Sequence, residues 1–458
     1  MSAHQSTLEM LDNQPVSRMF IRYLIPSMVG MLLMAVNVVV DGIMVGNRLG
    51  AEALAGVGIA GPVYTIFIAI SLWIGVGAAT RYSIAMGAKK TEQARAIFTQ
   101  SLVFIFGVTL FIGIAAYFFR EPLAYALGAN TQTYPYVSDY MTVLLLFGFV
   151  FTIESVFSVF IRNDGAPNVS MAALVIAAVA NIALNYLFLY VLDYGVAGAA
   201  TATVLAGATA ILVLSTHFFS PKSNLKLVRF SFKKRLFFMM VAIGFPSFLA
   251  EIGVSVFTIS HNIILEKMAG TSGVAAFSIL NYVHSVMLMM FLGMGSAIQP
   301  LISYYHGARN EERKKETVRI AVWITMGTGF LFFLIGQFAA QPIVSIFGDF
   351  PAAVTELATS GIQLFFIAYL FMGINFVMMT YYQSVGHVRM AIWITAAREI
   401  IIMLTLLHVL PPLFGLTGVW LAIPISECIV LMTIFHYQRK LRFKQMKKRT
   451  LQQEKLEF

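Results

Sequence analysis

The stretch Tyr-Gly-Val-Ala-Gly at residues 194–198 returns 220 positions later as Phe-Gly-Leu-Thr-Gly at 414–418. The same offset superimposes other positions at which helices bend, end or pack closely: Pro26 on Pro246, Gly50 on Gly270, Ala55 on Ala275, Gly75 on Gly295, Gly128 on Gly348, and Met-Gly-Ala-Lys at 86–89 on His-Gly-Ala-Arg at 306–309. This internal repeat predicts that the two halves share one fold. In an apolar chain, such duplication is typical of transporters that move one half against the other.

The composition excludes a soluble protein. The chain is 59% hydrophobic and only 11% charged, whereas soluble domains are about 25% charged. Apolar runs of about 18 residues or more mark membrane helices, and the sequence predicts twelve, roughly at 19–45, 54–82, 96–118, 138–161, 169–191, 196–218, 237–265, 274–304, 318–340, 361–385, 391–411 and 415–437. Six spans per half is an even number, so the repeat is expected to be parallel.

The net charge of +10 indicates membrane topology rather than nucleic-acid binding. If both termini are cytoplasmic, most of the Lys and Arg residues fall on the cytoplasmic side, as the positive-inside rule requires. Only Arg48, Arg120 and Lys267 fall on the opposite side, and Arg398 lies within a span. We therefore expect a multi-pass protein of the cell inner membrane with both ends in the cytoplasm.

The predicted division is an N-terminal six-helix lobe at 1–219, a cytoplasmic linker at 220–236, a C-terminal six-helix lobe at 237–438 and a basic cytoplasmic tail at 439–458. The N-terminus lacks the pattern of a cleaved signal peptide, so the first span is expected to be retained. The single cysteine, Cys428, excludes an internal disulfide. We expect a monomer.

Polar residues inside apolar spans identify a candidate cation site. A charge within the bilayer is costly, so it tends to mark an ion or proton pathway. Asp41 lies late in the first span, with Asn37 one turn before it, and Pro26 provides a hinge in the same helix. One carboxylate and several neutral oxygens suit H⁺ or Na⁺, and the polar residues of the fifth and sixth spans that would complete this site are Asn181, Asn185 and Thr203. The alternative is that such groups only join helices, and we favour it for Thr201.

Three further acids are candidates for a second coupling group, namely Glu154, Glu251 and Glu399. For Glu251 the alternative is a structural partner such as Arg398. For Glu399 the alternative is an internal ion pair with Arg398 or an interfacial anchor, and Glu427 is expected to brace the last span. No His or Cys spacing indicates a metal site, no cofactor is expected, and no catalytic constellation is present. The sequence thus predicts a transporter that is not an enzyme.

Substrate contacts are expected from the C-terminal lobe, where methionine and aromatic residues are frequent. Side chains facing a central cleft would form an adaptable surface for flat cationic molecules. The candidates are Tyr282, Met287, Met290, Gln299 and Phe376. For any single methionine or phenylalanine, packing is the alternative.

Over residues 18–438 the chain resembles the multidrug and toxic compound extrusion (MATE) family. The resemblance rests on Pro26 with Asp-Gly-Ile-Met-Val-Gly at 41–46, Gly-Ala-Glu-Ala-Leu-Ala-Gly at 50–56, Gly-Val-Gly at 75–77, Met-Gly-Ala at 86–88, Gln-Pro-Leu-Ile-Ser-Tyr at 299–304, Gly-Ala at 307–308 and Phe-Gly-Leu-Thr-Gly-Val-Trp at 414–420. The Gln-Pro pair in the eighth helix is similar to a bacterial branch of the family.

The resemblance implies an all-α membrane protein with two six-helix lobes in a V shape. It also implies export of amphipathic, often cationic, drug-like molecules in exchange for H⁺ or Na⁺. Some relatives carry a second acid where this chain has Asn185, and the loss of that charge favours a proton or a more weakly held cation. Relatives with a C-terminal cation site carry an acid in helix 10, and this chain has none there.

Two other classes of transporter remain to be weighed. A lipid-linked oligosaccharide flippase of the same superfamily would line its cavity with several basic residues to hold pyrophosphate, and only Arg398 lies within a span. Major-facilitator carriers share twelve helices and a parallel repeat, but their basic loop pattern is absent from Gly-Ala-Lys-Lys-Thr-Glu-Gln at 87–93.

Overall fold

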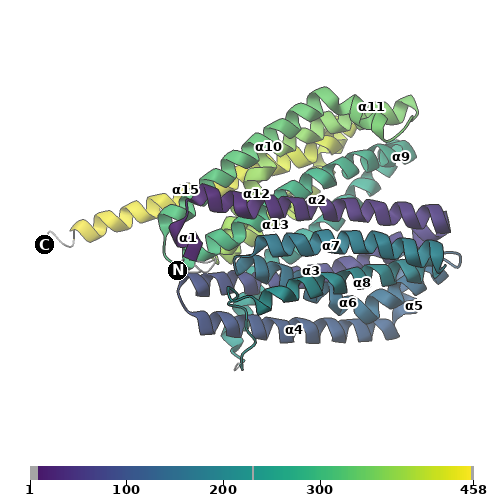
Figure 1. Cartoon of the computed structure of the whole chain (residues 1–458). Helices are drawn as coiled ribbons and strands as arrows, with labels where there is room; N and C mark the ends of the chain where they lie inside the picture. Colours follow the sequence, from purple (N-terminus) through teal and green to yellow (C-terminus); the bar gives the residue numbers. More distant parts are fainter. Residues whose placement is uncertain (1–8, 230–231, 455–458) are drawn as a thin grey trace. The chain divides into compact units, whose positions relative to one another are not determined.

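The computed structural model describes residues 9–229 and 232–454, and every regular element in them is a helix (Figure 1). Eleven helical segments are long and apolar enough to cross a membrane. One of them, α9 (Lys234–Gly307), is 74 residues long and turns at Gly270, whose φ of 59° and ψ of −152° are not helical. It therefore contains two spans, and the prediction of twelve is confirmed.

The first half begins with the short α1 (Glu9–Asn13) and continues through six spans. These are α2 (Val16–Leu49), α3 (Ala51–Gly87), α4 (Thr91–Phe118), α6 (Tyr134–Asn163), α7 (Pro167–Asn185) with the π-turn η1 (Tyr186–Val191), and α8 (Gly195–Ser215) with η2 (Thr216–Phe219). A short helix, α5 (Arg120–Ala126), precedes α6.

The second half repeats this order. After α9 come α10 (Glu311–Ile346), then α11 (Ala352–Phe365), η3 (Phe366–Ala368) and α12 (Tyr369–Ser384) in a single span. The next span combines α13 (Val388–Ala396), the π-turn η4 (Ala397–Ile401) and α14 (Ile402–Phe414), and α15 (Leu416–Glu454) ends the described chain. Residues 1–8 of the predicted N-terminal lobe, 230–231 of the linker and 455–458 of the tail lie outside the described residues.

The repeat is also visible in the backbone. Residues with positive φ recur at the same offset of 220 as the sequence motifs, in the pairs Gly50 and Gly270, Lys89 and Arg309, Gly128 and Gly348, and Gly195 and Gly415. The φ values of Gly195 and Gly415 are 58° and 59°, and those of Lys89 and Arg309 are 58° and 57°. The two halves therefore turn at equivalent places with nearly equal geometry.

By its internal contacts the chain forms two compact units. The first consists of Met1–Ile252, Ser285–Ala321 and Thr380–Val388, and the second of Gly253–His284, Val322–Met379 and Arg389–Phe458. Helix α9 contributes to both. The division into lobes at 219 and 237 follows the repeat in the sequence rather than these contacts, and it stays a prediction.

Within the first unit, α6 is the central helix. It packs against α3, α4 and α8, while α7 packs against α8 and α2 (Figure 1). Buried side chains at the α3–α6 contact include Phe67, Met141, Leu144 and Phe151. Within the second unit, α15 packs against α14 and α11. These contacts bring polar residues from several helices together in each unit.

Candidate functional site

The structure brings Asp41 of α2 together with Asn181 and Asn185 of α7 and Thr203 of α8. Asn185 Nδ2 donates to Asp41 Oδ1 at 2.5 Å and to Asn181 Oδ1 at 3.1 Å. Asn181 Nδ2 donates in turn to Thr203 Oγ1 at 3.3 Å. We call these four residues the Asp41 site. They form one chain of hydrogen bonds across three helices, and no ion pair to Asp41 occurs among the described residues.

Local sequence explains this convergence. Asn181 and Asn185 are four residues apart at the end of α7, so their side chains lie on one face. Both are 1% exposed. Helix α8 begins with small residues, which allow close approach to α7. Thr203 Oγ1 also donates to Ala199 O at 3.0 Å, whereas Thr201 Oγ1 donates only to Ala197 O of its own helix.

A cavity of about 90 Å³ adjoins this site, with room for several water molecules. Its polar lining consists of Asn37, Tyr64, Glu154, Asn181 and Thr203. Asn37 Oδ1 is buried and has no hydrogen-bond partner among the described residues. The structure therefore places Asn37 and Glu154 at the cavity that Asn181 and Thr203 share with the Asp41 site.

Glu154 is directed toward α8 in this cavity. A Cβ added to Gly207 would lie 3.4 Å from Glu154 Oε2, which is van der Waals contact, so the carboxylate lies against α8 at this glycine. Glu251, on α9, is half-buried, and neither it nor Glu154 forms an ion pair within the described part of the chain. Pro26 is buried inside the continuous helix α2, and its role as a hinge stays a prediction.

The five predicted cleft residues lie on two helices, Tyr282, Met287, Met290 and Gln299 on α9 and Phe376 on α12. Gln299 is 6% exposed, and its amide bonds Asn163 at 3.0 Å and Thr80 at 3.0 Å. Tyr282 is 61% exposed, and its ring stacks on Phe347. Met287 is buried and Met290 half-buried. Their contact with substrate stays a prediction.

Phe376 belongs to a polar cluster in the second unit, which we call the Arg398 cluster. It consists of Asn375 and Phe376 of α12, Arg398 and Glu399 of η4, and Glu427 of α15. Arg398 Nη2 pairs with Glu399 Oε1, and Arg398 Nε lies 3.2 Å from Glu427 Oε1. The guanidinium carbon lies 3.9 Å from the centre of the Phe376 ring. Asn375 Nδ2 donates to Glu427 Oε2 at 2.7 Å.

Comparison with known proteins identifies the family. The chain matches the MatE family model over residues 26–187 and 246–409. The two matched ranges cover more than half of the chain, and they begin at the equivalent prolines Pro26 and Pro246. The chain belongs to the MatE family. The predicted resemblance is thereby confirmed, and the described residues form a multi-pass membrane transporter of this family.

Curated relatives of this chain are similar to it over nearly its whole length. Multidrug export protein MepA of Staphylococcus aureus (strain MRSA252) is 25% identical over 423 residues, which cover 91% of this chain and 92% of MepA. MepA of Staphylococcus saprophyticus is 24% identical over 428 residues, with the same coverage.

Solved structures confirm the MatE fold. A crystal structure of MATE in the bent conformation has a TM-score of 0.89 at 24% identity, over 97% of this chain and 99% of that one. A MOP superfamily transporter from Pyrococcus furiosus has a TM-score of 0.89 at 23% identity, over 98% and 100%.

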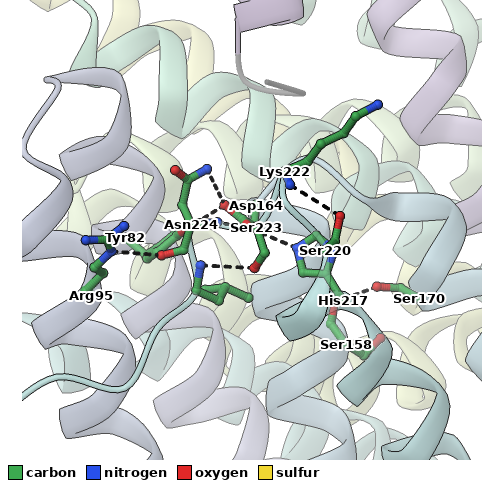
Figure 2. A network of polar contacts seen from close by, with 11 residues as sticks. Tyr82, Arg95, Ser158, Asp164, Ser170, His217, Ser220, Lys222, Ser223 and Asn224 are labelled. Carbon is green, nitrogen blue, oxygen red and sulfur yellow. Dashed lines mark hydrogen bonds and ion pairs between the residues drawn. The ribbon is translucent and has the colours of Figure 1, made fainter. Parts of the chain in front are cut away.

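Sequence reasoning did not find a further buried network of this MatE protein, which is centred on Asp164 (Figure 2). The carboxylate is fully buried and accepts from Tyr82 Oη at 2.7 Å and from the backbone N of Asn224 at 2.9 Å. Its Oδ2 also lies 2.8 Å from His217 Nε2. Arg95 Nε donates to Asn224 O at 3.3 Å. The network ties α3, α6 and η2 to the segment after residue 220, so its contacts are those of a structural anchor for the linker.

The sequence analysis also did not identify Asn375 as a candidate, although its position in the sequence indicates a buried polar contact. It is a lone amide in the apolar run Met-Gly-Ile-Asn-Phe-Val at 372–377, and such a residue needs a polar partner inside a membrane helix. Asp164 gave a weaker signal, because Arg-Asn-Asp-Gly at 162–165 reads as an ordinary helix end and turn.

Proposed function

We propose that this MatE protein is a cation-coupled multidrug efflux antiporter that exports amphipathic, often cationic, compounds by alternating access, with H⁺ as the coupling ion. The observation that carries the proposal is the Asp41 site. Asp41 is held by one neutral amide, that of Asn185, and forms no ion pair with a described residue. A carboxylate in that setting lacks a fixed counter-charge, so a mobile cation is the natural source of one.

The hydrogen bonds of the Asp41 site favour H⁺ over Na⁺. Asn185 presents its N–H groups to both Asp41 and Asn181, so the amide acts as a donor toward the carboxylate. A hard metal cation needs several oxygen ligands around it, and here one carboxylate oxygen is already occupied by a donor. A proton needs only one free lone pair of the carboxylate.

Protonation of Asp41 would weaken its bond to Asn185 and so loosen α2 from α7. Because Asn185, Asn181 and Thr203 are linked in series, that change passes to α8 as well. Pro26, fifteen residues before Asp41 in the same helix, is the candidate hinge for the movement. Glu154, Glu251 and Glu399 remain candidates for a second acid, and Asn37 for a polar contact of the ion.

The remaining features of the proposal come from charge distribution and relatives. The distribution of Lys and Arg supports a topology with both termini in the cytoplasm, and we propose that the protein lies in the cell inner (cytoplasmic) membrane. The curated relatives are named multidrug export proteins, which supports small drug-like substrates. Tyr282, Met287, Met290, Gln299 and Phe376 stay candidates for substrate contact, and we expect the protein to work as a monomer without a bound cofactor.

The lipid-linked oligosaccharide flippase is the alternative. Its substrate carries a pyrophosphate, which must be met by free cationic side chains. Arg398, the basic residue in the middle of a predicted span, is already paired with the carboxylates of Glu399 and Glu427. This pairing argues against the flippase.

The decisive experiment is ethidium efflux from proteoliposomes under an imposed pH gradient or Na⁺ gradient. We expect the pH gradient to drive efflux by the wild type, and Asp41→Asn to reduce it by about two orders of magnitude, the loss typical of a residue that takes part in proton transfer. The matched control is Asp139→Asn, because Asp139 is an exposed carboxylate on α6; it should transport like the wild type.

Other outcomes would change the assignment. Efflux driven only by Na⁺ would contradict H⁺ as the coupling ion while keeping Asp41 as its ligand. Equal activity of Asp41→Asn and the wild type would refute the role of Asp41. Failure to move ethidium or other drug-like cations would favour the flippase.

A further inference from the structure

The Arg398 cluster has an unequal number of acidic and basic groups in a buried place. Its two acids are Glu399 and Glu427, and its single cation is Arg398. The side chains are 6% exposed for Arg398, 16% for Glu399 and 3% for Glu427. If both acids were ionised, the cluster would carry one uncompensated negative charge away from water, which is strongly unfavourable.

The neighbouring groups do not supply the missing positive charge. Asn375 is fully buried and donates one N–H to Glu427 Oε2, while its Oδ1 has no hydrogen-bond partner among the described residues. The nearby His284 is buried, and its Nδ1 lies 2.9 Å from Tyr369 Oη. Helix α9 faces Glu399 with Gly253, which has no charge to offer.

We propose that the Arg398 cluster holds one exchangeable proton, shared between Glu399 and Glu427, as a second coupling site separate from Asp41. The inference rests on the proposed proton-driven antiport. Because both acids contact the same guanidinium, the proton belongs to the pair rather than to either residue. The two acids that share it lie on η4 and α15.

A proton fits this cluster better than a metal ion or the cationic group of a substrate. Three of the four carboxylate oxygens, Glu399 Oε1, Glu427 Oε1 and Glu427 Oε2, already face Arg398 or Asn375. A second full positive charge would also lie beside the guanidinium and be repelled by it. A proton adds to one oxygen lone pair and needs no new coordination shell.

Loss of the proton would change the contacts of three helical segments at once. Asn375 of α12 donates to Glu427 of α15, and Arg398 of η4 pairs with both Glu427 and its neighbour Glu399, so Glu427 links all three segments. The π-turn η4 is a type of distortion that is frequent at functional sites. The cluster is therefore built to convert a change of charge into a change of helix packing.

Infrared difference spectroscopy on the full chain in lipid nanodiscs tests the site without depending on transport. The spectra compare acidic and alkaline buffer in the carbonyl region of protonated carboxylic acids. Glu427→Gln leaves the neutral pair Arg398–Glu399, and Glu399→Gln leaves the neutral pair Arg398–Glu427. Both variants should therefore lose the same one carboxyl signal. Glu356→Gln, at an exposed acid of α11 in the same unit, is the matched control and should keep it.

Retention of the full signal in both Glu427→Gln and Glu399→Gln would overturn the proposal. Reversal potentials of ethidium transport then test coupling, and we expect each variant to move one proton fewer per substrate than the wild type. An unchanged ratio despite the lost signal would refute the coupling role and leave a structural proton. A wild type that is not driven by protons would instead refute the proposed antiport, and that result is separate from the infrared one.

Discussion

The Asp41 site and the Arg398 cluster lie in different halves of the duplicated chain, and their charges are arranged in different ways. Asp41 is a single acid that accepts a hydrogen bond from Asn185, and Asn185 is linked in series to Asn181 and the Thr203 hydroxyl. In the Arg398 cluster, two acids surround one arginine. Both centres include an asparagine that donates to a carboxylate, Asn185 in one and Asn375 in the other.

This difference shows that a repeat can preserve a fold while its two copies acquire different chemistry. The helices turn at equivalent glycines, yet the repeat equivalent of Asp41 is His261, which is buried and bonds the carbonyl of Phe257. A carboxylate among neutral groups gains its counter-charge from a mobile ion. A carboxylate paired with one arginine is neutralised by it and has a structural role. In the Arg398 cluster a second acid, Glu427, leaves an excess negative charge.

The largest expected effect comes from removing the fixed cation. Arg398→Gln leaves two carboxylates buried without a counter-charge, and breaking a buried ion pair in this way costs about 3–5 kcal/mol. We expect the free energy of unfolding in detergent to fall by this amount at neutral pH. The loss should be smaller in acid, where both carboxylates can bind protons.

The matched control is Arg48→Gln. Arg48 also pairs with an acid, Asp193, at 3.2 Å, but the two side chains are 40% and 70% exposed. An exposed pair contributes about 1 kcal/mol or less. Equal losses for Arg398→Gln and Arg48→Gln would mean that the Arg398 cluster is in contact with water and not a buried charge centre.

A second substitution, Asn185→Asp, would give the Asp41 site two acids, as in the Arg398 cluster, but no arginine to neutralise them. Asn185→Asp would place two carboxylates in contact, and these cannot both be ionised unless a cation lies between them. We expect Na⁺ to stabilise this variant by about 1.4 kcal/mol when its concentration is tenfold above the dissociation constant. The measurement is the shift of the melting temperature with added NaCl, with choline chloride as the salt control.

The wild type should not respond to Na⁺ in that assay, because Asn185 supplies N–H donors in place of the second carboxylate. Stabilisation of the wild type and of Asn185→Asp by the same amount would contradict the assignment of H⁺. It would show that one carboxylate and the neutral oxygens suffice to bind Na⁺.

Most of the fold could be predicted because each span is an apolar run that can be recognised from its own sequence, without knowledge of its neighbours. The Asp41 site could be predicted in part, since the spacing of Asn181 and Asn185 fixes a common face within one helix. The hydrogen bond from Asn185 to Asp41 joins residues 144 positions apart, and only the packing of α7 on α2 determines it. The π-helical segment η4 could not be predicted from the sequence either. Arg398 and Glu399 were foreseen as a pair, whereas their meeting with Glu427 depends on the register of α15.

The smallest expected effect lies at the far end of the Asp41 hydrogen-bond chain and tests whether that chain acts as a unit. Thr203→Val keeps the shape of the side chain but removes the acceptor for Asn181 Nδ2, which should cost about 1 kcal/mol, or about a fivefold loss of proton-driven efflux. Thr201→Val is the matched control on the same helix, because among the described residues the Thr201 hydroxyl bonds the carbonyl of Ala197 alone. If the two valine variants transport at the same rate, Thr203 only joins helices, and the functional chain ends at Asn181. If only Thr203→Val lowers the rate of proton-driven efflux, Asp41 responds to a hydroxyl that it does not contact. Such a response would show that the four groups act together and not independently.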